Sequence, residues 1–324
     1  RRVLFRSVMG VEGVHEMING AKDSPVDIYY GIPSSVPSTN EELETTGGVI
    51  GLAQMKQLMQ EDGVVCVGEV MNYRQIVKGD ELEITKFLDY LEEEVPQAVI
   101  EGHCPSLVGL DLAKFLYRGI DGDHTEHTLQ EIKERFQNGM FVELQEKMHR
   151  PEILDYIREH RLYEHCCFVT DDTMADKLKE QGQLNYVVRR AVEMGFPLNE
   201  AIYCASYTPA GRMNLRDRES LAPGRKADFQ LVKAEDCASF EPDYVFKDGR
   251  EIYHLGEPGK KTEPYRFPDH FYRSVHLDSI SAGQIEPRLE MDDGKAEVRV
   301  IEVNDGRTQT GERRVQMQGR KSTR

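Results

Sequence analysis

The chain has 324 residues, of which 39% are hydrophobic and 30% are charged, a balance typical of a soluble globular protein with a sizeable core. Its formal net charge of −16 and the lack of a long Lys/Arg stripe before the extreme C-terminus argue against a nucleic-acid-binding protein, which needs a basic face. No run approaches the roughly 18 apolar residues of a membrane span. None of the six cysteines forms a C-x-x-C pair, which favours a reducing compartment. We therefore expect a cytoplasmic protein that binds neither nucleic acid nor membrane.

Residues 1–7 (RRVLFRS) look foreign to the rest of the chain. They resemble a translated sequencing adapter more than a targeting signal, because their apolar stretch is too short for a signal peptide. We leave them out of the fold prediction and expect the natural N-terminus to be missing.

From residue 8 onward, short apolar runs alternate with segments that carry apolar residues at helical spacing. The runs predict strands at Val26–Ile32, Val64–Val70, Gln97–Glu101, Gly119–Asp123, Met140–Leu144 and Cys166–Thr170. The helical stripes fall at residues 82–91, 110–116, 129–136 and 153–157. This alternation predicts βα units around a parallel sheet. A doubly wound open sheet and a partial (β/α)8 barrel both fit six such strands.

After about Asn199 the pattern becomes that of a β-rich region. Residues 222–232 read as a turn that leads into a strand, and Asp248-Gly249 within residues 244–253 is a strong hairpin signal. Residues 257–270 read as a linker or loop. Short β runs follow, among them Ala296–Val303, and the polar, basic tail from Gly311 is predicted to be poorly ordered.

Four polar side chains stand where predicted strands end: Glu69, His103, His124 and Asp171, with Asp172 next to the last. In a parallel α/β barrel all strand carboxyl ends meet at one rim, so residues far apart in sequence can converge there. Imidazoles and carboxylates are suitable ligands for Zn²⁺, Mn²⁺ or Fe²⁺. The sequence therefore predicts a metal site at this rim.

Each of these residues also has an ordinary structural interpretation. Asp171 is placed to cap a helix before Lys177, and His124 to hydrogen-bond a loop carbonyl. Taken singly, such roles are commoner than metal ligation. The shared position of the residues at the ends of successive βα units favours the joint site.

Several motifs resemble the strand-end motifs of the adenine deaminase family of metal-dependent amidohydrolases. They are Pro33–Pro37, Gly68–Tyr73, Glu101–Leu107, Gly122–His124, Thr170–Asp172, Tyr207–Leu215 and Leu221–Asp228, and the match spans roughly residues 8–310. The resemblance implies an α/β fold: an incomplete TIM-like (β/α)8 amidohydrolase barrel with a small β-rich domain. Residues 8–215 would form barrel strands three to eight and residues 216–256 a β-sandwich segment. Residues 257–324 would start a C-terminal β-rich domain with a disordered tail.

The resemblance also implies roles for the rim residues. Glu69 would bridge two divalent metal ions, Mn²⁺ or else Fe²⁺ or Zn²⁺, with His103 and His124 as further ligands. Asp171 would ligate metal and shuttle a proton. Asp172 would contact substrate, although a helix-capping role is equally open.

The sequence departs from the family in two respects. The His-x-His pair of the first barrel strand and the acidic-His motif after the second are absent from this chain. Many family members also have an acidic residue directly after the sixth-strand histidine, whereas Thr125 follows His124 here. We assign His127, a tempting additional acid–base group, to the first turn of a helix that begins at Thr128.

The implied activity is metal-dependent hydrolytic deamination of adenine to hypoxanthine and ammonia, a purine-salvage reaction with a free base as substrate. Two alternatives remain open: an amidohydrolase of cyclic amides or N-acyl amino acids, and a barrel without catalytic activity. We expect the whole protein to form a homo-oligomer. The chain in hand we expect to be truncated at both ends, to fold poorly alone and to be inactive, since a barrel without two strands exposes sheet edges.

Overall fold

The computed structural model describes residues 3–37, 47–218, 220–233, 240–259, 263–273, 278–285, 295–303 and 310–318. The chain divides into two compact units, Arg1–Tyr272 and Arg273–Arg324. The first unit contains the predicted barrel segment and the small sheet that follows it. The boundary between the units lies inside the region 257–324, which we expected to start a C-terminal β-rich domain with a disordered tail.

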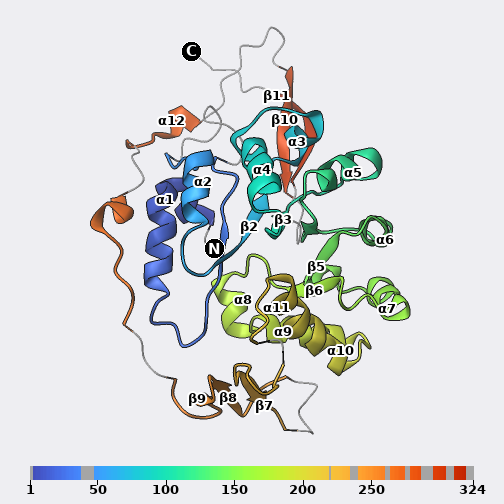
Figure 1. Ribbon diagram of the computed structural model, residues 1–324. Helices are drawn as coiled ribbons and strands as arrows, with labels where there is room; N and C mark the ends of the chain where they lie inside the picture. The colour runs from blue at the N-terminus through green and yellow to red at the C-terminus, as the bar shows by residue number, and fades with distance from the viewer. Residues whose placement is uncertain are drawn as a thin grey trace. The chain divides into compact units, whose positions relative to one another are not determined.

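A parallel sheet of six strands forms the centre of the first unit (Figure 1). All six predicted strands are present, as β1 (Tyr30–Ile32), β2 (Val64–Val70), β3 (Ile100–Gly102), β4 (Gly122–Asp123), β5 (Phe141–Gln145) and β6 (Cys166–Val169). Each strand pairs in parallel with the next one along the chain. A doubly wound sheet would reverse its strand order, whereas this order runs from β1 to β6 without reversal. The sheet is therefore wound as a barrel, and β1 and β6 each have one strand neighbour among the described residues.

Helices lie between these strands and after β6, and they cover the sheet (Figure 1). They are α2 (Leu52–Leu58), α3 (Tyr73–Lys78), α4 (Glu83–Glu94), α5 (Gly109–Tyr117), α6 (Leu129–Gln137), α7 (Pro151–His160), α8 (Ala175–Glu180) and α9 (Leu184–Glu193). The four predicted helical stripes correspond to α4, α5, α6 and α7. In α4, the stripe residues Ile84, Phe87, Leu88 and Leu91 are all buried, because three- and four-residue spacing places them on one face.

Two further helical regions complete this unit. Before the sheet, α1 (Val3–Gly20) is interrupted at Gly10, whose φ of 56° is not helical. It extends back to Val3, into the segment that we had left out of the prediction. After α9 come α10 (Leu198–Ile202), a π-helical segment (Tyr203–Tyr207) and α11 (Thr208–Arg212). Arg212 of α11 donates hydrogen bonds to Glu101 (2.9 Å) and to Asp121 (2.6 Å), which ties this last helix to the β3–β4 region.

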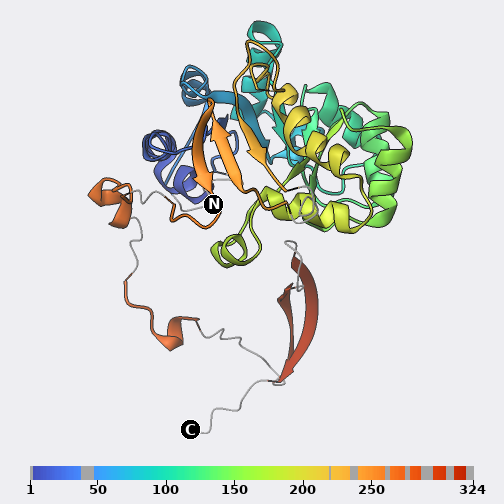
Figure 2. The ribbon, with the colours of Figure 1, turned by 90° about the horizontal axis from the view of Figure 1, so that it is seen from below.

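The predicted hairpin is present in a three-stranded antiparallel sheet of β7 (Phe229–Leu231), β8 (Tyr244–Lys247) and β9 (Arg250–His254), drawn in orange in Figure 2. Asp248 and Gly249 connect β8 to β9 with φ values of 49° and 73°. Both values lie in the left-handed region that two-residue hairpin turns require, which confirms the signal read from the Asp-Gly pair.

The second unit contains α12 (Ala282–Ile285) and the long antiparallel strands β10 (Lys295–Val303) and β11 (Thr310–Gln318). The prediction of a strand over Ala296–Val303 is confirmed. The prediction of a poorly ordered tail from Gly311 is wrong for residues 311–318, which pair with β10 along their whole length and form ion pairs with it between diagonal neighbours. Arg314 bonds to Glu297 and Arg299 to Glu312 across the pair. Residues 319–324 lie outside the described residues. Among the residues that the structure describes, no helix is long and apolar enough to cross a membrane.

Candidate metal centre

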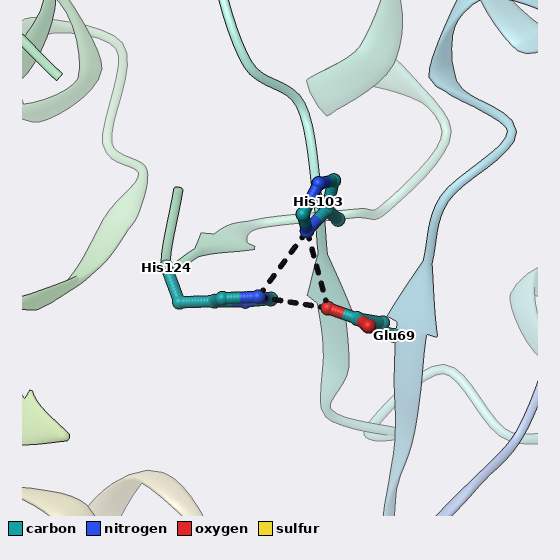
Figure 3. Close-up of side chains that lie close together, drawn as sticks. All are labelled: Glu69, His103 and His124. Carbon is teal, nitrogen blue, oxygen red and sulfur yellow. Dashed lines mark hydrogen bonds and ion pairs between the residues drawn. The ribbon is translucent and has the colours of Figure 1, made fainter. Parts of the chain in front are cut away.

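Three of the predicted site residues meet at the carboxyl ends of neighbouring strands (Figure 3). Glu69 is the penultimate residue of β2, His103 follows β3 directly and His124 follows β4 directly. Because β2, β3 and β4 are adjacent and parallel, their ends bring these three side chains to one rim. The convergence expected from the strand-end pattern is therefore present for these three residues.

The three side chains direct their polar atoms at one another. Oε2 of Glu69 lies 2.8 Å from Nε2 of His124 and 3.3 Å from Nδ1 of His103. The two imidazole nitrogens are 3.3 Å apart, and the ring planes are inclined by 62°. All three atoms lie within 4.8 Å of one another, close enough to share one metal ion. Two imidazole nitrogens and a carboxylate oxygen form a donor set suited to Zn²⁺, Mn²⁺ or Fe²⁺.

The electrostatics of the centre favour a positive charge beside Glu69. Burial alone would raise the pKa of Glu69, but hydrogen bonds from His103 and His124 outweigh it and hold this pKa well below its usual range. Burial alone would lower the pKa of His124, yet the Glu69 carboxylate raises it to about 9. In the metal-free chain a proton on His124 thus neutralises Glu69, and a bound cation would take the place of that proton.

Asp171 lies apart from these three atoms. It follows β6, it is exposed, and it adopts a φ of 53°. Its Oδ2 accepts a hydrogen bond of 2.9 Å from Nε2 of Gln145, which also donates to the backbone oxygen of His124 at 2.8 Å. Asp171 lines the same cavity of about 370 Å³ as Glu69 and His124. It therefore faces the centre across the cavity.

The alternative roles considered for the rim residues are not observed. Helix α8 begins at Ala175 with Met174 as its N-cap, so neither Asp171 nor Asp172 is the N-cap residue. Asp172 is exposed and is not among the residues that line the cavity. The imidazole of His124 contacts carboxylates rather than a loop carbonyl.

Sequence reasoning missed Glu143, a cavity residue in the middle of β5. Its Oε2 lies 3.7 Å from Nδ1 of His124, on the opposite side of the ring from Glu69. Burial, reinforced by the nearby Glu101 carboxylate, raises the pKa of Glu143 to about 8. A signal was available: a lone carboxylate inside the apolar run Met140–Leu144 is a polar residue at a buried position, which often marks a functional site.

The prediction for His127 is wrong in its position. Helix α6 begins at Leu129 with Thr128 as its N-cap, so His127 precedes the helix. Its imidazole is buried and bonds to Asp123, which removes it from the cavity.

The chain is similar in sequence to known adenine deaminases. It is 41% identical to adenine deaminase 2 of Shouchella clausii over 94% of this chain and 53% of that protein. It is 40% identical to an adenine deaminase of Clostridium perfringens over 87% of this chain and 49% of that protein. The chain thus spans about half the length of these curated relatives.

Solved structures share the fold at lower sequence identity. N-acetyl-D-glucosamine-6-phosphate deacetylase from Mycobacterium smegmatis superposes with a TM-score of 0.52 at 14% identity, over 76% of this chain and 74% of that one. Enamidase, a member of the amidohydrolase superfamily, superposes with a TM-score of 0.50 at 14% identity, over 79% and 70%. A family model described as "Amidohydrolase family" matches residues 165–252. The resemblance read from the strand-end motifs is confirmed: the chain is a homologue of the adenine deaminases, and its residues 165–252 match the amidohydrolase family model.

Proposed function

We propose that this chain carries part of the active site of a metal-dependent deaminase that converts adenine and water to hypoxanthine and ammonia. The observation that carries the proposal is the meeting of Glu69, His103 and His124 at one rim, in a chain homologous to adenine deaminases over about nine tenths of its length. The proposal includes a cytoplasmic location, a role in purine salvage and a homo-oligomeric whole protein.

The residues present fit a divalent cation. Glu69, His103 and His124 would hold it, and Asp171 is the candidate for a further ligand from across the cavity. Glu69 has two carboxylate oxygens, so it is able to bridge two ions, for which we propose Mn²⁺, Fe²⁺ or Zn²⁺. Such an ion, when bound, lowers the pKa of a water molecule to around 7 and so supplies a nucleophile at neutral pH.

The side chains of the cavity have distinct tasks in this reaction. The exposed Asp171 carboxylate accepts the proton of the water that attacks C6 of adenine, and it then delivers this proton to the amino group that leaves as ammonia. Gln145 orients Asp171 through the hydrogen bond of 2.9 Å. One C–O bond forms and one C–N bond breaks, with one water consumed.

The cavity has a size and lining that suit a purine base. Its volume of about 370 Å³ lies within the range of small-molecule sites, and its wall includes the aromatic residues Tyr29 and Tyr30. The Asp171 carboxylate offers acceptors for the N–H groups of the base, and Glu143, whose raised pKa keeps it largely protonated at pH 7, offers one acceptor oxygen and one O–H donor.

The test is release of ammonia and hypoxanthine from adenine after loading with Mn²⁺. Because the chain spans about half of its relatives, the assay compares the chain alone with the chain fused to the part of the Shouchella clausii protein that it does not match. We expect activity from the fusion, none from the chain alone, and loss of activity in the fusion carrying Glu69→Gln. A fusion that holds stoichiometric metal yet releases no ammonia from adenine would refute the proposal. Ring opening of a cyclic amide by that fusion would favour the alternative substrate class, and absence of bound metal would favour a non-catalytic barrel.

A further inference from the structure

A second polar cluster lies directly behind the candidate metal centre and is closed to solvent. It consists of Cys104, Asp123, Thr125, His127 and Arg135, which come from the loop after β3, from β4 and the loop after it, and from α6. The side chains of Asp123, His127 and Arg135 are each 0% exposed. A carboxylate, an imidazole and a guanidinium in such a place are costly unless every charge is paired.

Asp123 is the centre of this cluster, and its two oxygens are fully engaged. Its Oδ2 accepts hydrogen bonds from Nε2 of His127 (2.7 Å), Nε of Arg135 (2.8 Å) and Sγ of Cys104 (3.1 Å). Its Oδ1 accepts from the hydroxyl of Thr125 (2.9 Å) and from the backbone N–H groups of Thr125 (3.1 Å) and Cys104 (3.3 Å). Burial alone would raise the pKa of Asp123, but these partners keep it well below its usual range, so the residue stays charged.

The cluster is hydrogen-bonded to the backbone next to both imidazoles, directly after His124 and directly after His103. Asp123 and Thr125 flank His124 in sequence, and Cys104 follows His103 directly. Arg135 also donates to the backbone oxygen of Cys104 at 2.9 Å. The Asp123 carboxylate on β4 thus accepts hydrogen bonds from the two backbone segments that carry the candidate ligands His103 and His124.

Alternation along the chain explains why the two clusters lie back to back. Successive side chains of an extended segment point to opposite sides, so His124 faces the cavity while Asp123 and Thr125 face the helix α6. The same alternation places the side chain of Cys104 behind the rim, next to His103 on the rim.

We propose that Asp123 is a positioning residue, which fixes the spacing of His103 and His124 through the backbone so that both imidazoles can hold one divalent cation. This inference rests on the proposed function. It assigns to Asp123, Arg135 and Cys104 a task in metal binding beyond their contribution to the fold.

The experiment measures the dissociation constant of Mn²⁺ for the whole chain and for Asp123→Asn, which keeps the shape of the side chain and removes its charge. Outer partners of metal ligands typically contribute roughly 10–100-fold in affinity, and we expect a loss in this range. The matched control is Leu154→Ala in α7, a side chain 2% exposed in a different part of the core. It should lower thermal stability comparably and change the dissociation constant less than twofold.

A second readout needs no metal. The ¹⁵N shifts of the imidazoles in the metal-free chain report the bonds of His103 and His124 to Glu69. We expect Asp123→Asn to shift or broaden these signals and Leu154→Ala to leave them unchanged. If neither the wild-type chain nor the fusion binds Mn²⁺, the proposed function fails, whereas the imidazole signals still decide the positioning role.

Milder variants keep the test decisive if Asp123→Asn does not fold. Thr125→Val and Cys104→Ala each remove one side-chain hydrogen bond to Asp123, and we expect smaller changes in the same direction. Wild-type metal affinity together with wild-type imidazole signals in a folded variant overturns the proposal. An equal loss of affinity in Leu154→Ala overturns it as well.

Discussion

His124 and His127 are three residues apart, and each imidazole lies close to a carboxylate, yet their surroundings are opposite. Nε2 of His124 is 2.8 Å from Glu69 and faces a cavity, while Nε2 of His127 is 2.7 Å from Asp123 in a closed cluster. Among the described residues, the charge partners of Glu69 are imidazoles alone, whereas Asp123 also has Arg135, which is always protonated. Arg135 thus places a permanent positive charge in the cluster around Asp123. In the candidate metal centre, the ligand atoms of Glu69, His103 and His124 instead point at a place where a cation can bind. This difference separates a candidate metal site from a structural ion cluster built of the same residue types.

The largest effect on stability should come from removing the permanent cation. Arg135→Met leaves Asp123 buried without its permanently charged partner, and breaking such a pair typically costs about 3–5 kcal/mol. Urea unfolding of the whole chain measures this loss. The control is Arg218→Met, whose pair with Asp27 is partly exposed and should contribute less than about 1 kcal/mol. A loss of less than about 1 kcal/mol for Arg135→Met would mean that the second cluster does not depend on its guanidinium.

The next-largest effect tests the candidate metal centre. Glu69→Gln removes the charge that attracts a cation to the centre, and a single ligand supplies roughly 10²–10³-fold of the affinity of a complete site. Titration with Mn²⁺ measures the dissociation constant. Glu61→Gln, at a partly exposed pair with His15, should leave it unchanged. An unaltered dissociation constant in Glu69→Gln would show that the metal binds elsewhere.

A third imidazole extends the comparison, because His149 is buried with no hydrogen bond to either ring nitrogen within the described residues. Burial, assisted by the charge of Arg190, lowers the pKa of His149 to about 4. Between pH 6.5 and pH 4 the unfolded chain takes up a proton on this residue that the folded chain does not. The contribution of His149 to the free energy of unfolding therefore falls by on the order of 3 kcal/mol as the pH falls through this window.

The variant His149→Leu removes this titration and keeps a similar apolar volume against Phe168. Urea unfolding at pH 7 and pH 4 should show a smaller loss of stability on acidification in the variant than in the wild-type chain. Equal losses in the two proteins would mean that His149 is not buried in its neutral form.

The sequence predicted the scaffold better than the direction of its side chains. Strands and helices such as β2 and α4 follow from local apolar spacing, and the order of the motifs was sufficient to place Glu69, His103 and His124 at one rim. The sequence did not reveal the closed cluster around Asp123, because the contact of this residue with Arg135 joins β4 to α6, twelve residues further along the chain.

The same physical reason explains the other errors. Glu143 reaches the cavity because of the register of β5 with its neighbours, and the strand at residues 310–318 forms by pairing with β10. The composition of a short segment does not specify which other segment it pairs with. Asp171 remains a prediction as a ligand, since its carboxylate is held by Gln145 and lies outside the group of three donor atoms.

The smallest effect concerns the start of α6, the helix that carries Arg135 into the second cluster. Thr128 caps this helix: its hydroxyl accepts from the backbone N–H of Glu131 (3.3 Å), and Oε2 of Glu131 accepts from the backbone N–H of Thr128 (2.8 Å). Thr128→Ala should lower the free energy of unfolding by about 1 kcal/mol, while Thr128→Ser should keep nearly all of it. Because four hydrogen bonds to residues outside α6 also hold Arg135 in place, the loss of the cap should leave the dissociation constant of Mn²⁺ within about twofold of the wild-type value. A larger change in metal affinity from this exposed residue would show that the two clusters are coupled through the whole of α6 rather than through Asp123 alone.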